Sequence, residues 1–199
     1  MATDTAHETI SGFLDRLADR TATPGGGAVA ALAAAHAAAL VAMAARFTDD
    51  PSAPAVAAAA DRLRERAVSL ADDDQTAFTA VSAAYSLPRA TEQERERRTT
   101  AVRDAMAGAS EPPAGVVTVA AELVALAERL LPVVNATLVA DLAAAADAAH
   151  AAASTGRLNV DANLRGRADH PLRAGMPDVD DLLQRAVDLR ESVRKGFHA

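Results

Sequence analysis

The chain has 199 residues, a formal net charge of −7 at pH 7, 50% hydrophobic residues, only 3% aromatic residues, and neither tryptophan nor cysteine. An acidic chain with few stacking aromatics excludes a typical nucleic-acid-binding surface, and the lack of cysteine excludes disulfides and thiolate chemistry. Alanine, the best helix former, supplies most of the apolar content but fills little volume. We therefore expect an all-α fold, with residues 1–199 forming a single-domain up-and-down bundle of long Ala-rich helices. Such helices gain by packing as a symmetric homodimer or a higher homo-oligomer.

The N-terminal residues lack a basic leader followed by an apolar core, so we expect no signal peptide. The apolar run from Ala28 to Ala45 is as long as a membrane span, but His36 interrupts it and alanine is only weakly apolar. We interpret this run as a buried helix of a soluble, cytoplasmic protein with no membrane partner.

The first two helices are predicted from a capping signal and a glycine turn. Thr5 and Glu8 have the spacing of a capping box, which predicts an amphipathic helix ending before Thr21. A Pro-Gly-Gly-Gly turn then opens a second helix, which extends to about Thr48. Its larger side chains recur at helical spacing and predict its inward face, with the histidine in the middle: Val29, Leu32, His36, Leu40, Met43 and Phe47.

A third, long helix is predicted from Pro54 to the Leu87-Pro88 break. Asp74 falls on its apolar face, whereas Asp72 and Asp73 point elsewhere. Thr91 and Glu94 form a second capping box, which predicts a fourth helix as far as Gly108.

The second half of the chain predicts three more helices. A fifth covers Val116 to Leu130, and a sixth is capped by Asn135, with Asp141 at the edge of its inward face. Gly156 is a point where the sixth helix can break before Asn159 and Asn163. Residues 165–175 are expected to form a loop, and a last helix starts at Pro177-Asp178. No strand pattern and no HxxxH spacing occurs, so no metal site is predicted.

Asp74 and Asp141 are the candidate catalytic residues, because desolvation on an apolar face raises the pKa of a carboxyl group and suits it to acid-base chemistry. Either residue would equally serve to pair with an arginine or to accept helix-end amides. Asn135, Asn159 and Asn163 are candidate ligands for a heterocycle edge, or simply helix ends. The turn Pro24-Gly25-Gly26-Gly27 suits an anion at the start of a helix, or close helix packing.

These segments resemble a known family. Pro24-Gly25-Gly26-Gly27 with the following Val29-Ala30-Ala31-Leu32 and Thr48 is similar to the signature of the formiminotransferase-cyclodeaminase C-terminal domain family, which includes stand-alone methenyltetrahydrofolate cyclohydrolases. Further segments agree in order and spacing: Asp72-Asp73-Asp74 with Phe78, Tyr85-Ser86-Leu87-Pro88, Glu111-Pro112-Pro113, and Asn135 through Asp141 to Asn159-Val160 and Asn163-Leu164. The resemblance extends from about Phe13 to Leu164.

The resemblance implies an all-helical symmetric homodimer that acts on one-carbon units carried by tetrahydrofolate. Such an enzyme either opens methenyltetrahydrofolate with water or closes formiminotetrahydrofolate with loss of ammonia. The folate is a substrate, and no tightly bound cofactor is expected. A carboxyl group held away from bulk water suits both reactions, because each moves a proton at one amidine-like carbon.

Several positions depart from the family pattern. Ala28 stands where the family usually has serine, and residues 49–54 replace a segment with cations. His36 is either an acid-base or ligand candidate or a satisfied core histidine, and Arg157 either replaces a lost cation or forms an interface salt bridge. Two alternatives therefore stay open: a family relative acting on another formimino or amidine substrate, and a helical oligomer without chemistry.

Overall fold

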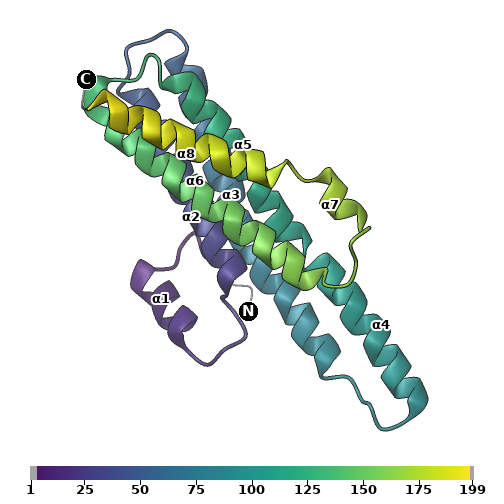
Figure 1. Cartoon of the computed structure of the whole chain (residues 1–199). Coiled ribbons are helices and arrows are strands. Elements are labelled where there is room, and N and C mark those ends of the chain that lie inside the picture. Colours follow the sequence, from purple (N-terminus) through teal and green to yellow (C-terminus); the bar gives the residue numbers. More distant parts are fainter. Residues whose placement is uncertain (1–3, 198–199) are drawn as a thin grey trace.

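A computed structural model describes residues 4–197, which form a single all-helical domain without a strand in that range (Figure 1). The elements follow one another as α1 (Ile10–Ala18), α2 (Gly26–Arg46), α3 (Ala53–Tyr85), α4 (Glu92–Gly108), α5 (Glu111–Leu130), the 3₁₀ turn η1 (Ala136–Leu138), α6 (Val139–Asn163), α7 (Pro171–Gly175) and α8 (Val179–Gly196). The all-α bundle predicted from composition is confirmed.

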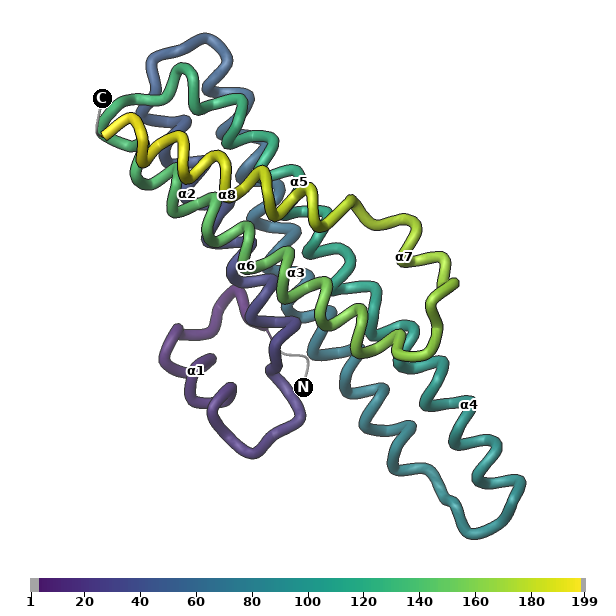
Figure 2. The backbone as a smooth tube through the Cα atoms, viewed as in Figure 1, coloured from purple at the N-terminus to yellow at the C-terminus, as the bar shows by residue number. Residues whose placement is uncertain are grey.

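Helix α2 forms the centre of the bundle. It packs against α3, α5 and α6, and α8 lies along α6 on the outside (Figure 2). Because α2 and α6 run antiparallel, the start of α2 lies beside the end of α6. The α2 helix is long and apolar enough to span a membrane, but 61% of its most apolar window is buried inside the bundle. It is therefore packed as the interior helix that we predicted.

The inward face of α2 differs from the prediction. The fully buried side chains are alanines and Val41, whereas Val29 is 40% exposed, Phe47 is 66% exposed, and His36 is also exposed. The physical reason is that α2 is surrounded on most sides, so only small side chains allow its neighbours to approach closely. The larger side chains are left on the remaining outer face.

The predicted helix boundaries are largely right. The Thr91–Glu94 capping box opens α4, with the Glu94 amide donating to Thr91 Oγ1 at 3.2 Å. Helix α1 is capped by Thr9 instead of the predicted Thr5, whose backbone and hydroxyl groups both donate to Asp72 on α3. Thr5 and Glu8 therefore have the spacing of a capping box but do not form one.

Helix α6 continues unbroken through Gly156, contrary to the expected break. A Cβ at this position would lie 2.9 Å from the carbonyl oxygen of Pro113, so the glycine allows α5 and α6 to pack closely.

Pro112 and Pro113 fall in the first turn of α5, which starts at Glu111. The predicted loop at 165–175 contains the short helix α7, and Asp178 caps α8 as expected.

The far end of α3 is important for the site. This helix has 33 residues and continues past the start of α2, so its last turns and α4 extend beyond the rest of the bundle (Figure 1). Helix α4 has no buried residue. The α3–α4 hairpin is therefore an arm that is open to solvent.

Candidate functional site

The start of α2 carries the glycine turn, and Asp74 of α3 is seated against it. Pro24 is buried, Gly25 is the N-cap, and Gly26 and Gly27 form the first residues of the helix. A Cβ on residue 27 would overlap with the carboxylate of Asp74. Only glycine lets this carboxylate approach the backbone so closely.

The environment of Asp74 favours its neutral form. Burial raises the pKa of the Asp74 carboxyl, and a hydrogen bond from the backbone amide of Ala28 acts in the opposite direction with less effect. Of its two acidic neighbours, Asp72 accepts hydrogen bonds from Thr5 and Asp73 is exposed. The sequence-based prediction that Asp74 alone of the three points inward is confirmed, and its raised pKa suits it to exchange protons.

Asn159 of α6 completes this corner of the bundle. Its Nδ2 lies 3.6 Å from the place where a Cβ of residue 26 would stand, and it donates to the carbonyl oxygen of Thr155 at 2.8 Å. Asn163 follows one turn later and donates to the carbonyl oxygen of Ala109 at 2.8 Å. Asn159 therefore adjoins the glycine turn, whereas the Asn163 amide ties the end of α6 to the α4–α5 connection.

Asn135 and Asp141 lie at the opposite end of the bundle. The Asn135 side chain donates to the carbonyl oxygen of Phe47 at 3.0 Å and accepts from the amide of Thr137 at 3.0 Å. Asp141 is half-buried in the first turn of α6 and is eighteen residues from Asn159, or about 27 Å along a straight helix. The two candidate catalytic residues, Asp74 and Asp141, are therefore not brought together within one chain.

His36 and Arg157 also lie away from the glycine turn. His36 is nine residues after Gly27, which places it on the opposite side of α2 and about 13 Å further along the axis. Arg157 forms ion pairs with Asp180 of α8 and, at 3.8 Å, with Asp161 of its own helix. Arg157 is therefore held by ion pairs within its own chain, whereas the alternative considered from the sequence was a salt bridge at an interface.

A polar network beside Asp74 was not identified from the sequence. Gln75 is only 2% exposed; its Oε1 accepts from Arg16 at 3.1 Å and its Nε2 donates to Thr5 at 3.2 Å. Arg16 in turn makes two hydrogen bonds to Glu8, at 2.8 and 2.7 Å. This network attaches α1 to α3, and no local pattern signals it because its members come from separate segments.

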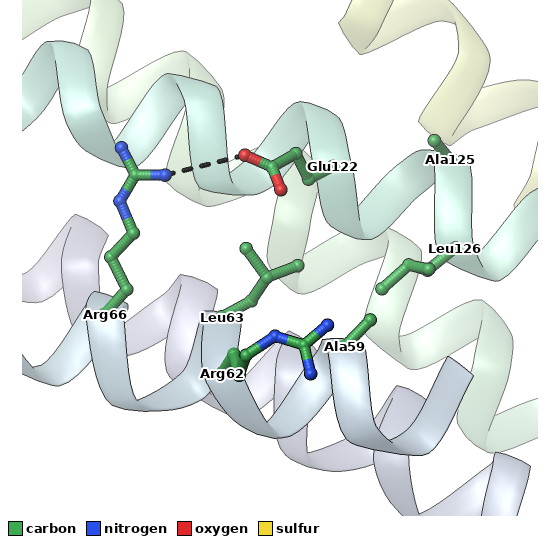
Figure 3. A pocket seen from close by; sticks show the side chains of 7 residues that line it. All are labelled: Ala59, Arg62, Leu63, Arg66, Glu122, Ala125 and Leu126. Atoms are coloured by element: carbon green, nitrogen blue, oxygen red, sulfur yellow. Dashed lines mark ion pairs between the residues drawn. The ribbon is translucent and has the colours of Figure 1, made fainter. Parts of the chain in front are cut away.

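A different pocket, of about 390 Å³, lies between α3 and α5 (Figure 3). Arg66 and Glu122 face each other across it at 3.5 Å, and both are about half exposed. The Glu122 carboxylate is thus already paired with the Arg66 guanidinium, and both groups are exposed to solvent. This pocket lacks the desolvated carboxyl that marks the glycine turn as the candidate site.

The fold and the site define a helical-bundle protein that holds a carboxyl group of raised pKa against a glycine-rich helix start. The sequence profile described as Formiminotransferase-cyclodeaminase matches residues 9–178, and the chain belongs to this family.

Full-length relatives support this assignment. The chain is 32% identical to the methenyltetrahydrofolate cyclohydrolase of Methylorubrum extorquens over 94% of both chains. It is similar to the crystal structure of the formiminotetrahydrofolate cyclodeaminase of Thermotoga maritima, with a TM-score of 0.73 and 28% identity over 96% of this chain and 93% of that one. It is also 30% identical to the rat formimidoyltransferase-cyclodeaminase, of which it covers only 31%.

Proposed function

We propose that this protein is a folate-dependent one-carbon enzyme, a methenyltetrahydrofolate cyclohydrolase or a formiminotetrahydrofolate cyclodeaminase. The observation that carries the proposal is the Asp74 carboxyl, desolvated against Gly27 at the start of α2. The names of the full-length relatives support both activities. The substrate is the folate itself, no tightly bound cofactor takes part, and we place the reaction in the cytoplasm.

Asp74 moves the proton that either reaction requires. In the hydrolytic direction, water adds to the carbon between the two folate nitrogens and Asp74 takes its proton. The bond from this carbon to one nitrogen then breaks as that nitrogen receives a proton and the new hydroxyl loses its proton, which leaves a formyl group on the other nitrogen. In the deaminating direction, a folate nitrogen attacks the formimino carbon, and the departing ammonia carries away a proton. A carboxyl with a raised pKa lies closer to the working pH and is therefore the better carrier.

Turnover by a matched pair of variants tests this role. Asp74→Asn keeps the shape and an acceptor oxygen but removes the exchangeable proton, and we expect a loss of about 10²–10⁴-fold in kcat. Asp73→Asn changes an exposed neighbour on the same helix and is expected to keep wild-type turnover. Loss of methenyl absorbance and release of ammonia distinguish the two activities. If wild-type protein converts neither substrate faster than the spontaneous reaction, the proposal is refuted. Another amidine substrate or a non-catalytic oligomer is then favoured.

We further propose that a second copy packs on the outer face of α2. This face carries half-exposed to exposed apolar side chains around His36, and no Asp, Glu, Lys or Arg occurs between residues 21 and 45. An apolar groove of about 330 Å³ between α1 and α2 extends the same face, where Ile10 is 80% exposed. Two such faces, each about 30 Å long, pair antiparallel about a two-fold axis near His36 and Leu40.

Antiparallel pairing places the start of one α2 beside the end of the other. Asp141 of the partner subunit would then lie at the end of the bundle that holds Asp74. Each of two equivalent sites would combine the glycine turn of one chain with the Asn135–Asp141 segment of the other. This arrangement would bring both acidic residues into one pocket, although within one chain Asp141 lies about 27 Å along α6 from the level of the glycine turn.

Mixing two inactive variants tests the shared site. Asp74→Asn and Asp141→Asn are each expected to be inactive, but a mixed dimer contains one intact site out of two. Because random exchange makes half of the dimers mixed, the mixture is expected to regain about a quarter of wild-type turnover. A dimer that regains nothing after exchange, or a monomeric mass by light scattering, would contradict the arrangement.

A further inference from the structure

The outer turns of α3 carry aromatic side chains in line with Asp74. Phe78 follows Asp74 by one turn and Tyr85 by three, so all three lie on one stripe of the helix. Phe78 is 38% exposed and Tyr85 is 51% exposed. Both are uncovered because α3 extends past the start of α2. The whole chain has only four phenylalanines and one tyrosine, so two of its five aromatic side chains lie on this short stripe.

A cation accompanies the outer aromatic ring. The guanidinium of Arg98 on α4 lies over the Tyr85 ring, 5.3 Å from its centroid, and its Nε donates to the Tyr85 carbonyl oxygen at 3.1 Å. No carboxylate among residues 4–197 forms an ion pair with Arg98, whereas Arg95 and Arg103 on the same helix are each paired. Arg98 is thus held in place by Tyr85 while its charge stays available.

We propose that this stripe binds the p-aminobenzoylglutamate part of the substrate, with Phe78 against the aryl ring and Tyr85 with Arg98 at the carboxylates. The inference rests on the proposed folate function and assigns the binding of the aryl ring and the glutamate, which lie beyond the reacting nitrogens. The order of groups agrees: along α3, Phe78 lies about 6 Å and Tyr85 about 16 Å beyond Asp74. Tetrahydrofolate presents, in the same order from its reacting carbon, an aryl ring and then carboxylates.

The charges and surfaces of the arm fit this ligand. An exposed phenylalanine offers a flat face on which an aryl ring stacks, and an unpaired guanidinium suits a carboxylate. The reacting carbon would then meet Asp74 at the glycine turn, where Asn159 adjoins Gly26. The arm would supply binding to a part of the substrate that undergoes no chemistry.

Kinetics with two substrates test the arm. The first substrate is 5,10-methenyltetrahydrofolate, and the second is an analogue that keeps both bridged nitrogens but carries a methyl group in place of the benzoylglutamate on the outer nitrogen. For Phe78→Ala and Arg98→Gln we expect KM for the full substrate to rise about 10-fold at nearly constant kcat, and no change with the analogue. Phe197→Ala, which truncates an exposed aromatic at the other end of the bundle, serves as the control and is expected to change neither. Equal losses on both substrates, or no loss on either, would overturn the assignment.

Binding of p-aminobenzoylglutamate alone separates this proposal from the enzymatic one. Ligand-observed NMR is expected to detect binding to wild type and Phe197→Ala, and about 10-fold weaker binding to Arg98→Gln. If wild type turns over folate but binds this fragment equally well without Arg98, the arm is refuted while the function stands. If wild type binds it through Arg98 but shows no turnover, the function is refuted and the arm stands. A change of oligomeric mass in Phe78→Ala would show instead that a second copy covers the stripe, and would overturn the proposal.

Discussion

Replacement of Gly27 by alanine tests the packing on which the site depends. The added Cβ would overlap with the Asp74 carboxylate, so that α3 or the side chain must move. Overpacking of this kind costs about 1–3 kcal/mol, while the helix preference of alanine over glycine returns about 0.5–1 kcal/mol. Gly27 does not have a positive φ, so backbone strain adds nothing. We expect a net loss of about 1–2 kcal/mol, which in a domain of this size lowers Tm by roughly 3–6 °C.

Two further variants isolate the cause. Gly26→Ala adds the same methyl group one residue earlier, where it meets Asn159 at an ordinary 3.6 Å, and is expected to keep or slightly raise Tm. Adding Asp74→Ala to Gly27→Ala removes the overlapping carboxylate, and a double-mutant cycle by thermal unfolding is expected to give a coupling of about 1–3 kcal/mol. Equal Tm values for the two single alanine variants, or strict additivity in the cycle, would refute the reasoning.

Three other changes have defined outcomes. Burial raises the pKa of Asp74 above its ordinary 3.8, so the stability contributed by its neutral carboxyl is complete below pH 3.8 and is lost as pH rises. Asp74→Asn should therefore be at least as stable as wild type at pH 7. A lower Tm for this variant at pH 7 would contradict burial as the cause of the raised pKa. Asn135→Ala removes the cap of η1 and the bond to Phe47, and chemical denaturation should show a loss of about 1–2 kcal/mol. Gln75→Leu leaves Nη1 of Arg16 without its acceptor, so hydrogen exchange should rise in α1 before it rises elsewhere; uniform protection would argue against this network as the attachment.

The sequence predicts the helices well where the signal is local. The Thr91–Glu94 box and the Asp178 cap set the starts of α4 and α8, because both are satisfied within one turn. The buried face of α2 could not be predicted from the size of its side chains. The rule that larger apolar side chains point inward holds for a helix with one covered face, but α2 is covered on most sides. Its alanines are buried because they allow close approach, and Phe47 is left outside.

The site was predicted in part, for a related reason. Periodicity shows which way a side chain points, and it placed Asp74 correctly against the core. It does not show how far along the bundle a residue lies, so it could not show that the two candidates Asp74 and Asp141 lie at opposite ends of the bundle. The alternating direction of the long helices does show how far along the bundle a residue lies. Antiparallel neighbours joined by short connections place the start of α2 beside the end of α6, and therefore place Gly26 beside Asn159. The same alternation puts Asp141 beside the end of α2, at the other end of α6 from the glycine turn; in the proposed antiparallel dimer, the carboxylate near a given glycine turn would be that of the second chain.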